Sequence, residues 1–110
     1  MATNRTAGFT ALGDPTRRAI FERLAGGGRP VGELARELPV SRPAVSQHLK
    51  VLKGAGLVVD RRAGNRRIYQ LDPVGVGALR DQLEQFWTKA LTTYKALVEE
   101  DVEQQTEEGS

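Results

Sequence analysis

The chain has 110 residues and a net charge of +2, which suits a single domain with a modest core. It contains no cysteine, which excludes disulfides, thiolate catalysis and thiolate metal sites. No apolar run approaches the roughly 18 residues of a membrane span, so we expect a cytoplasmic protein without a membrane segment. We expect residues 1–103 to form one domain and residues 104–110 to be an acidic, disordered tail.

Charge is unevenly divided along the chain. Residues 1–71 carry thirteen basic and five acidic side chains, whereas residues 72–110 carry three basic and nine acidic ones. A basic segment joined to an acidic one indicates a polyanionic partner for the first and a different task for the second. The alternative is ordinary solvated surface charge, and charge alone does not separate the two.

The first quarter of the chain predicts two helices. One is expected over about residues 4–12. The other begins after Asp14, a good N-cap residue, and has Pro15 in its first position, where the missing N–H costs nothing. The glycine run at 26–28 ends this second helix.

Two further helices follow, joined by a tight turn. A short helix lies between Pro30 and Pro39 and turns Val31, Leu34 and Leu38 inward. The next helix is capped by Ser41, has Pro43 in its first turn and runs to about residue 55, where Gly56 provides a left-handed C-cap. Together they predict a helix-turn-helix.

The period of the apolar residues changes after this helix. Residues 57–71 have apolar ends around the turn signal Gly64-Asn65, which predicts a β-hairpin. A long helix then opens at Asp72 and Pro73 and runs to about Glu103. The expected fold is mainly α: about five helices and a two-stranded β-hairpin, placed as the wing of a winged helix-turn-helix.

The second helix of the helix-turn-helix has two different sides. The inward side is apolar: Ala44, Val45, Leu49 and Leu52. The outward side is polar: Arg42, Ser46, Gln47, Lys50 and Lys53, with His48 near the boundary. Gln pairs with adenine, Arg with guanine and Ser with either, and no acid occurs from residue 41 to residue 59. This face therefore favours contact with DNA over a merely solvated surface, which normally mixes Glu with Lys.

The predicted wing is rich in arginine. Arg61, Arg62, Arg66 and Arg67 bracket its turn and place guanidinium groups at a protruding tip. They are suited to clamping phosphates or entering a narrow minor groove. The alternative is that they protect a hairpin edge from aggregation.

Other charged residues carry less information. Arg17, near the start of the second helix, is better explained as a surface charge than as a phosphate contact. His48 is the only histidine and cannot form a metal site alone; we expect it to pack at the domain edge and to donate to DNA.

The last helix has two adjoining apolar lines, which together are wider than one packing face of a small domain requires. Part of this stripe is expected to form a two-fold dimer together with the first helix. The alternative is a monomer whose wing and body cover both lines. The expected interface residues are Phe9, Leu12, Leu83, Phe86, Trp87, Leu91, Tyr94 and Val98.

Three segments carry a family resemblance: "ALGDPTRRAIFERLA", "VGELARELPVSRPAVSQHLKVLKGAGLV" and "RRAGNRRIYQL". They resemble the ArsR/SmtB-type winged-helix regulators of bacteria over about residues 9–98. The resemblance implies a homodimer that binds a palindromic promoter operator and represses transcription. It implies DNA contacts through the wing arginines and through Ser41, Arg42, Pro43, Ser46, Gln47 and Lys50.

The chain departs from the family where many members bind metals. The segment that carries cysteines in arsenic- and cadmium-type sites reads "VGELARE" here, and the last helix has acidic residues but no histidine. We therefore expect no metal site, no cofactor and, with one histidine and no phosphate loop, no catalytic residue. The alternatives are a protein-interaction module on this fold, or a metal-responsive regulator acting through a weak carboxylate and histidine site or a separate sensor protein.

Overall fold

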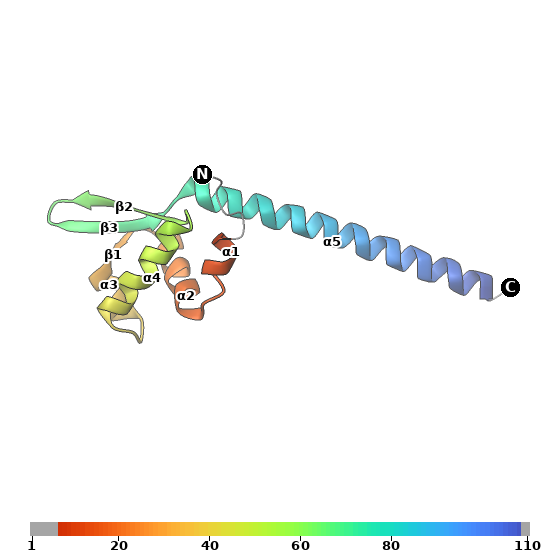
Figure 1. The fold of residues 1–110 in the computed structure, drawn as a ribbon, viewed down its shortest axis with the longest axis horizontal. Helices are drawn as coiled ribbons and strands as arrows, with labels where there is room; N and C mark the ends of the chain where they lie inside the picture. Colours follow the sequence, from red (N-terminus) through yellow and green to blue (C-terminus); the bar gives the residue numbers. More distant parts are fainter. Residues whose placement is uncertain (1–6, 109–110) are drawn as a thin grey trace. The chain divides into compact units, whose positions relative to one another are not determined.

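Five helices and a three-stranded sheet are present in the computed structural model, which describes residues 7–108 (Figure 1). The chain divides into two units, one up to Leu79, called the winged unit below, and one from Arg80 onward. The elements in chain order are α1 (Ala7–Ala11), α2 (Pro15–Ala25), β1 (Arg29–Pro30), α3 (Val31–Glu37), α4 (Arg42–Gly54), β2 (Val58–Ala63), β3 (Arg66–Leu71) and α5 (Pro73–Glu108).

The two predicted N-caps are confirmed. The carboxylate of Asp14 accepts a hydrogen bond of 2.9 Å from the backbone N–H of Arg17, at the start of α2. The hydroxyl of Ser41 accepts one of 3.3 Å from the backbone N–H of Ala44, at the start of α4. Each satisfies an N–H group that the first turn of a helix leaves without a partner. These local bonds fix where α2 and the second helix of the helix-turn-helix begin.

The predicted hairpin is confirmed: β2 and β3 pair within residues 57–71, and the turn lies at Gly64 and Asn65. The antiparallel ladder runs from Val58 opposite Leu71 to Ala63 opposite Arg66. Gly64 has a φ of 65°, and in the described residues positive φ occurs only at glycines, which fits the hairpin turn that requires glycine at its first central position. The wing therefore closes through two residues, Gly64 and Asn65.

The sheet has one strand more than the predicted two-stranded hairpin, because β1 pairs beside β3. Arg29 lies opposite Tyr69 and Pro30 opposite Ile68. A strand of two residues shows no alternation in the sequence, and Pro30 is tolerated only because β1 is at the edge of the sheet. A Cβ on Gly28 would lie 2.8 Å from the Ile68 side chain, so this glycine lets the chain approach β3.

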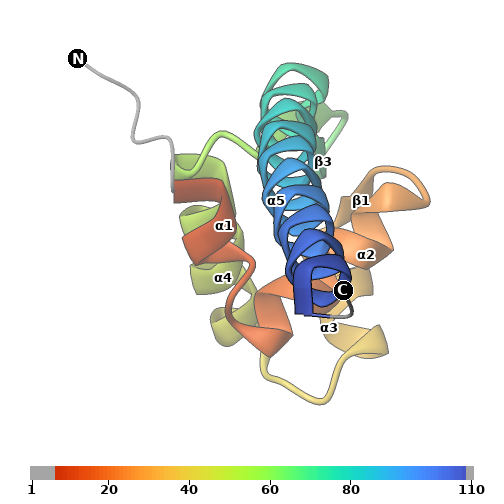
Figure 2. The same ribbon diagram turned by 90° about the vertical axis from the view of Figure 1, so that its right-hand side faces the viewer.

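The core of the winged unit is formed by side chains from α2, α3, α4 and the start of β2. Those that are fully buried are Ile20, Leu34, Val45, Leu49, Leu52, Leu57 and Val58. The inward sides predicted for α3 and α4 are thus confirmed, at spacings of three and four residues. α1 lies beside α4 (Figure 2), and its Ala11 joins the same core.

The helix α5 starts in the winged unit. Asp72 precedes it and accepts a hydrogen bond of 3.0 Å from the N–H of Val74. The first turn packs backbone against backbone, since a Cβ on Gly75 would lie 1.6 Å from the carbonyl oxygen of Gly56. The helix continues to Glu108, past the end expected near Glu103. Residues 4–6, also expected to be helical, lie outside the described residues.

Candidate nucleic-acid interface

The polar side of α4 is exposed as the sequence predicted. The side chains at the beginning and on the outer side of this helix all reach solvent: Ser41, Arg42, Pro43, Ser46, Gln47 and Lys50. Val45, Leu49 and Leu52 on the opposite side are 0–1% exposed. Because the apolar side is anchored in the core, the rotation of α4 about its axis is fixed and the polar side faces outward.

His48 is half-buried and faces the start of α2. Its Nδ1 lies 3.4 Å from Nη1 of Arg17 and 3.9 Å from Oδ2 of Asp14. Arg17 also donates to the carbonyl of Ala11 at 2.7 Å, so its guanidinium is held inside the fold rather than free on the surface. The hydrogen bond from the backbone N–H of Arg17, followed by the nearby charge of its guanidinium, lowers the pKa of Asp14. His48 thus ties α4 to α2, and its contact with DNA stays a prediction.

The four wing arginines lie on two faces of the hairpin. Arg62 and Arg67 are directly opposite each other in the ladder and share one face. Arg66, opposite Ala63, and Arg61 lie on the other face, where Nε of Arg61 lies 3.3 Å from the amide oxygen of Gln70. All four are exposed. The tip of the wing therefore presents cationic groups to both sides.

Asp60 joins the wing to the end of α4. Its Oδ1 lies 2.6 Å from Nζ of Lys53, and its Oδ2 is paired with Nη1 of Arg67. The Asp60 side chain is only 5% exposed. Hydrogen bonds from Lys53 and then Arg67 lower the pKa of this carboxyl. This cluster was not predicted from the sequence, although Asp60 and Arg67 lie diagonally across a hairpin whose turn was predicted.

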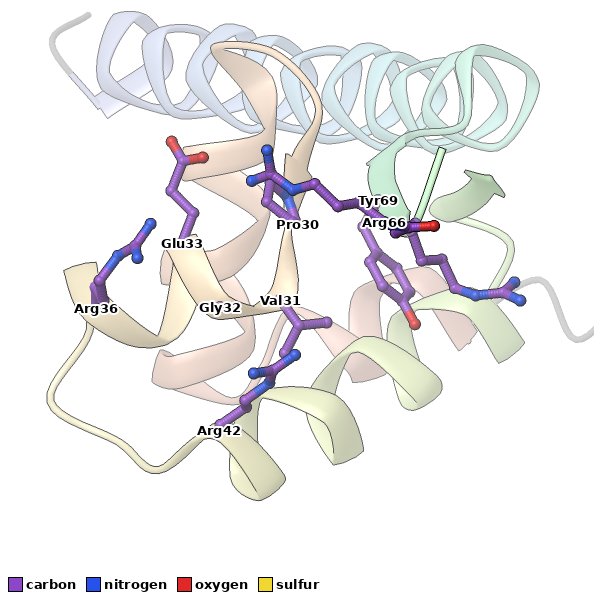
Figure 3. Close-up of a pocket in the computed structure, with 10 residues that line it drawn as sticks. Pro30, Val31, Gly32, Glu33, Arg36, Arg42, Arg66 and Tyr69 are labelled. Atoms are coloured by element: carbon purple, nitrogen blue, oxygen red, sulfur yellow. The ribbon is translucent and has the colours of Figure 1, made fainter. Parts of the chain in front are cut away.

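A pocket of about 360 Å³ opens between α3, α4 and the wing (Figure 3). Arg36 and Glu33 extend into it from α3, Arg42 from α4, and Tyr69 from β3. The ion pairs of the described residues do not include Arg36, Arg42 or Arg66, so no described carboxylate lies within 4.0 Å of these three guanidinium groups, although Glu33 lines the same pocket. Arg36 was missed from sequence, because only the folded chain brings α3 beside the wing.

The residues expected at a dimer interface are mostly on the surface of the chain. In α5 the large apolar side chains from Leu83 to Val98 are 42–66% exposed. The rings of Phe86 and Trp87 lie edge to face, with their centroids 6.3 Å apart. Phe9 of α1 is 42% exposed, whereas Leu12, which follows α1, packs against the core of the winged unit. The seven exposed residues are Phe9, Leu83, Phe86, Trp87, Leu91, Tyr94 and Val98.

Two features are absent from the described residues 7–108. There, no three or more histidine or acidic side chains gather as a metal site would require. None of the described helices combines the length and apolar character of a membrane span.

The geometry defines a class of protein. α3 and α4 form a helix-turn-helix, and β2 and β3 follow it as a wing (Figure 1). This is a winged helix-turn-helix, in which the second helix of the pair enters the major groove of DNA.

Comparison with known proteins identifies the family. The helix-turn-helix domain family matches residues 12–61. The HTH-type transcriptional regulator Rv2034 of Mycobacterium tuberculosis is 68% identical over 91 residues, which cover 83% of this chain and 85% of that protein. The HTH-type transcriptional repressor SmtB of the same species is 48% identical over 61 residues, 56% of this chain and 45% of the repressor.

Solved structures agree with these relatives. The solution structure of the homodimeric winged helix-turn-helix DNA-binding domain of Mb0332 from Mycobacterium bovis has a TM-score of 0.63 and 28% identity, and the match covers 76% of this chain and 78% of that one. The chain belongs to the ArsR/SmtB-type family of helix-turn-helix transcriptional regulators.

Proposed function

We propose that this protein is a transcriptional regulator that binds double-stranded DNA sequence-specifically, as a homodimer on a palindromic promoter operator. The observation that carries the proposal is the exposed, acid-free polar side of α4 beside an arginine-rich wing. Polar side chains on a rigidly held helix suit base edges, and guanidinium groups suit phosphates.

Each part of the surface has a separate role in this proposal. Gln47 and Ser46 read bases, together with Arg42 and Lys50 where they reach a base or the adjoining phosphate. The phosphate backbone is held by the three pocket arginines that have no ion-pair partner, Arg36, Arg42 and Arg66. Contacts by Ser41, Pro43 and His48 and by the other wing arginines complete the interface.

The dimer follows from the apolar surface of α5. Trp87, Leu91, Tyr94 and Val98 occur at spacings of three and four residues, so they share one side of the helix. Side chains of this size are unfavourable in water, and a second copy offers the same surface for two-fold pairing. The homodimeric relative supports this assembly. Two α4 helices would then reach successive major grooves about 34 Å apart.

The regulator is proposed to repress, as the relative named a repressor does, and to act in the cytoplasm without enzymatic activity. As an alternative, it would respond to a metal through a weak carboxylate and histidine site or through a separate sensor protein.

A mobility-shift experiment tests the proposal. Fragments tiled across the promoter of its own gene are titrated with the purified protein, with and without divalent metals, against a random duplex of equal length. We expect one fragment to bind at least about a thousandfold more tightly than random DNA. Equal binding to all fragments would contradict sequence specificity. A protein that ignores duplex DNA at low salt would instead be an interaction module on this fold.

A further inference from the structure

Asp60 is exceptional in the charge pattern of the interface. It is the only acidic residue between Ser41 and Leu71, a segment that contains all of α4 and the wing. An acid beside a DNA-binding surface repels phosphate, so its presence there opposes affinity. The structure shows that Asp60 does not stand alone on this surface, because two cations cover it.

Each oxygen of the Asp60 carboxylate contacts a cation from a different element. Lys53, in the last turn of α4, lies 2.6 Å from Oδ1, and Arg67, in β3, is paired with Oδ2. The cations are 56% and 58% exposed, whereas the Asp60 side chain is 5% exposed. The carboxylate therefore lies beneath two charges that remain accessible to a ligand.

This arrangement holds two mobile side chains in one place. Lys and Arg each lose rotamer entropy when fixed, and a shared carboxylate fixes both before DNA arrives. Both cations lower the pKa of Asp60, so its carboxylate stays ionised to a lower pH than that of an ordinary aspartate. Arg67 uses one N–H group of five on Asp60, so donors remain for a phosphate.

We propose that Asp60 is a specificity-determining residue that pins Lys53 and Arg67 for a correctly docked duplex and weakens their attraction for phosphates of random DNA. The proposal rests on the proposed function. A random duplex offers phosphates without the matching bases, and only freely moving, uncompensated cations gain fully from it. Arg66, which has no such partner among the described residues, is the contrasting case.

The test uses Asp60→Asn, which keeps the shape of the side chain and removes its charge. The control is Asp81→Asn, which makes the same charge change on α5, where the side chain is 63% exposed beside Arg80. The full-length variants are titrated with the best promoter fragment and with a scrambled duplex of the same composition, over a series of salt concentrations. Circular dichroism checks that each variant is folded.

We expect Asp60→Asn to bind the scrambled duplex about tenfold more tightly at low salt, with a salt slope steeper by about 0.9 for each cation released. Its affinity for the promoter fragment should change less, so the ratio of the two affinities falls. Asp81→Asn should leave the slope as it is in the wild type. An unchanged slope in Asp60→Asn, or an equal loss of affinity for both duplexes, would overturn the proposal.

A second pair of variants decides the question if Asp60→Asn does not fold. Lys53→Gln and Lys50→Gln remove the same charge from one helix, but only Lys53 is compensated by Asp60. Lys50→Gln should reduce the slope on scrambled DNA by about 0.9 and Lys53→Gln by much less. Equal reductions would refute the role of Asp60. If the wild-type protein did not bind DNA at all, the proposed function itself would be wrong. That result is distinguishable from both variant outcomes.

Discussion

The large apolar side chains differ in solvent exposure between the winged unit and the part of α5 from Arg80 onward. In the winged unit the largest ones, such as Ile20, Leu34 and Leu52, are completely buried. In α5, Phe86, Trp87 and Tyr94 are 56–66% exposed. The first unit has a core that its own residues complete, whereas the second leaves a row of large apolar side chains exposed to solvent. The contrast separates the unit that we propose to bind DNA from the helix that we propose to pair two copies of the chain.

The largest expected effect lies in the winged unit, at the contact between Gly75 and Gly56. Gly75→Ala would place a Cβ 1.6 Å from a carbonyl oxygen, so backbone must move, and we expect a loss of at least about 3 kcal/mol in the free energy of unfolding. Gly77→Ala is the matched control. Its Cβ meets no atom within 4 Å, and alanine in a helix should stabilise by up to about 1 kcal/mol. Denaturant unfolding measures both, and equal stability of the two variants would contradict the described packing.

The second prediction concerns the exposed side of α5. Leu91→Glu puts a charge in the proposed dimer interface and should convert the dimer to a monomer at micromolar concentration, because burying an unpaired charge costs several kcal/mol. Gln85→Glu adds the same charge on the opposite side of the helix and should leave the dimer intact. Sedimentation velocity reports the mass. A dimeric Leu91→Glu protein would place the interface elsewhere.

The third prediction concerns Gln47, which α4 exposes on its polar side. Gln47→Ala should reduce discrimination between the operator and random DNA by about 1–3 kcal/mol, because a side chain that pairs with a base edge is lost. Competition titrations with both duplexes measure it. If affinity for both falls equally, Gln47 contacts the backbone and not a base.

The smallest effect compares two neighbouring arginines of the wing. Arg66→Ala should lower the salt slope of DNA binding by about 0.9, because its charge is uncompensated. Arg67→Ala should lower it less, since Asp60 already offsets that charge. Titrations over a salt series distinguish the two variants. A larger change of the salt slope in Arg67→Ala than in Arg66→Ala would contradict the offsetting of Arg67 by Asp60.

The elements that could be predicted from sequence are those fixed by local chemistry. Asp14 and Ser41 predict helix starts, because their side chains accept hydrogen bonds from backbone N–H groups three residues later. Gly64 predicts a turn, because glycine readily adopts the positive φ that this turn requires. The inward side of α4 follows from apolar spacing alone.

What the sequence did not predict depends on distant parts of the chain. β1 exists because β3, almost forty residues later, pairs with it, and its two residues carry no period of their own. Arg36 joins the pocket only because α3 packs beside α4 and the wing. The Asp60 cluster could be predicted in part. The hairpin register places Asp60 on the same face as Arg67, whereas its contact with Lys53 forms only when α4 and the hairpin pack together.

The contact of Gly75 with Gly56 also has a mechanical consequence. Gly56 lies two residues after the end of α4, and Gly75 belongs to the first turn of α5, so main chain meets main chain with no side chain between them. A displacement of that turn cannot be absorbed by a change of rotamer and must be transmitted to the corner that ends α4. A rigid shift of the first turn of α5 would thus move the end of α4 with it.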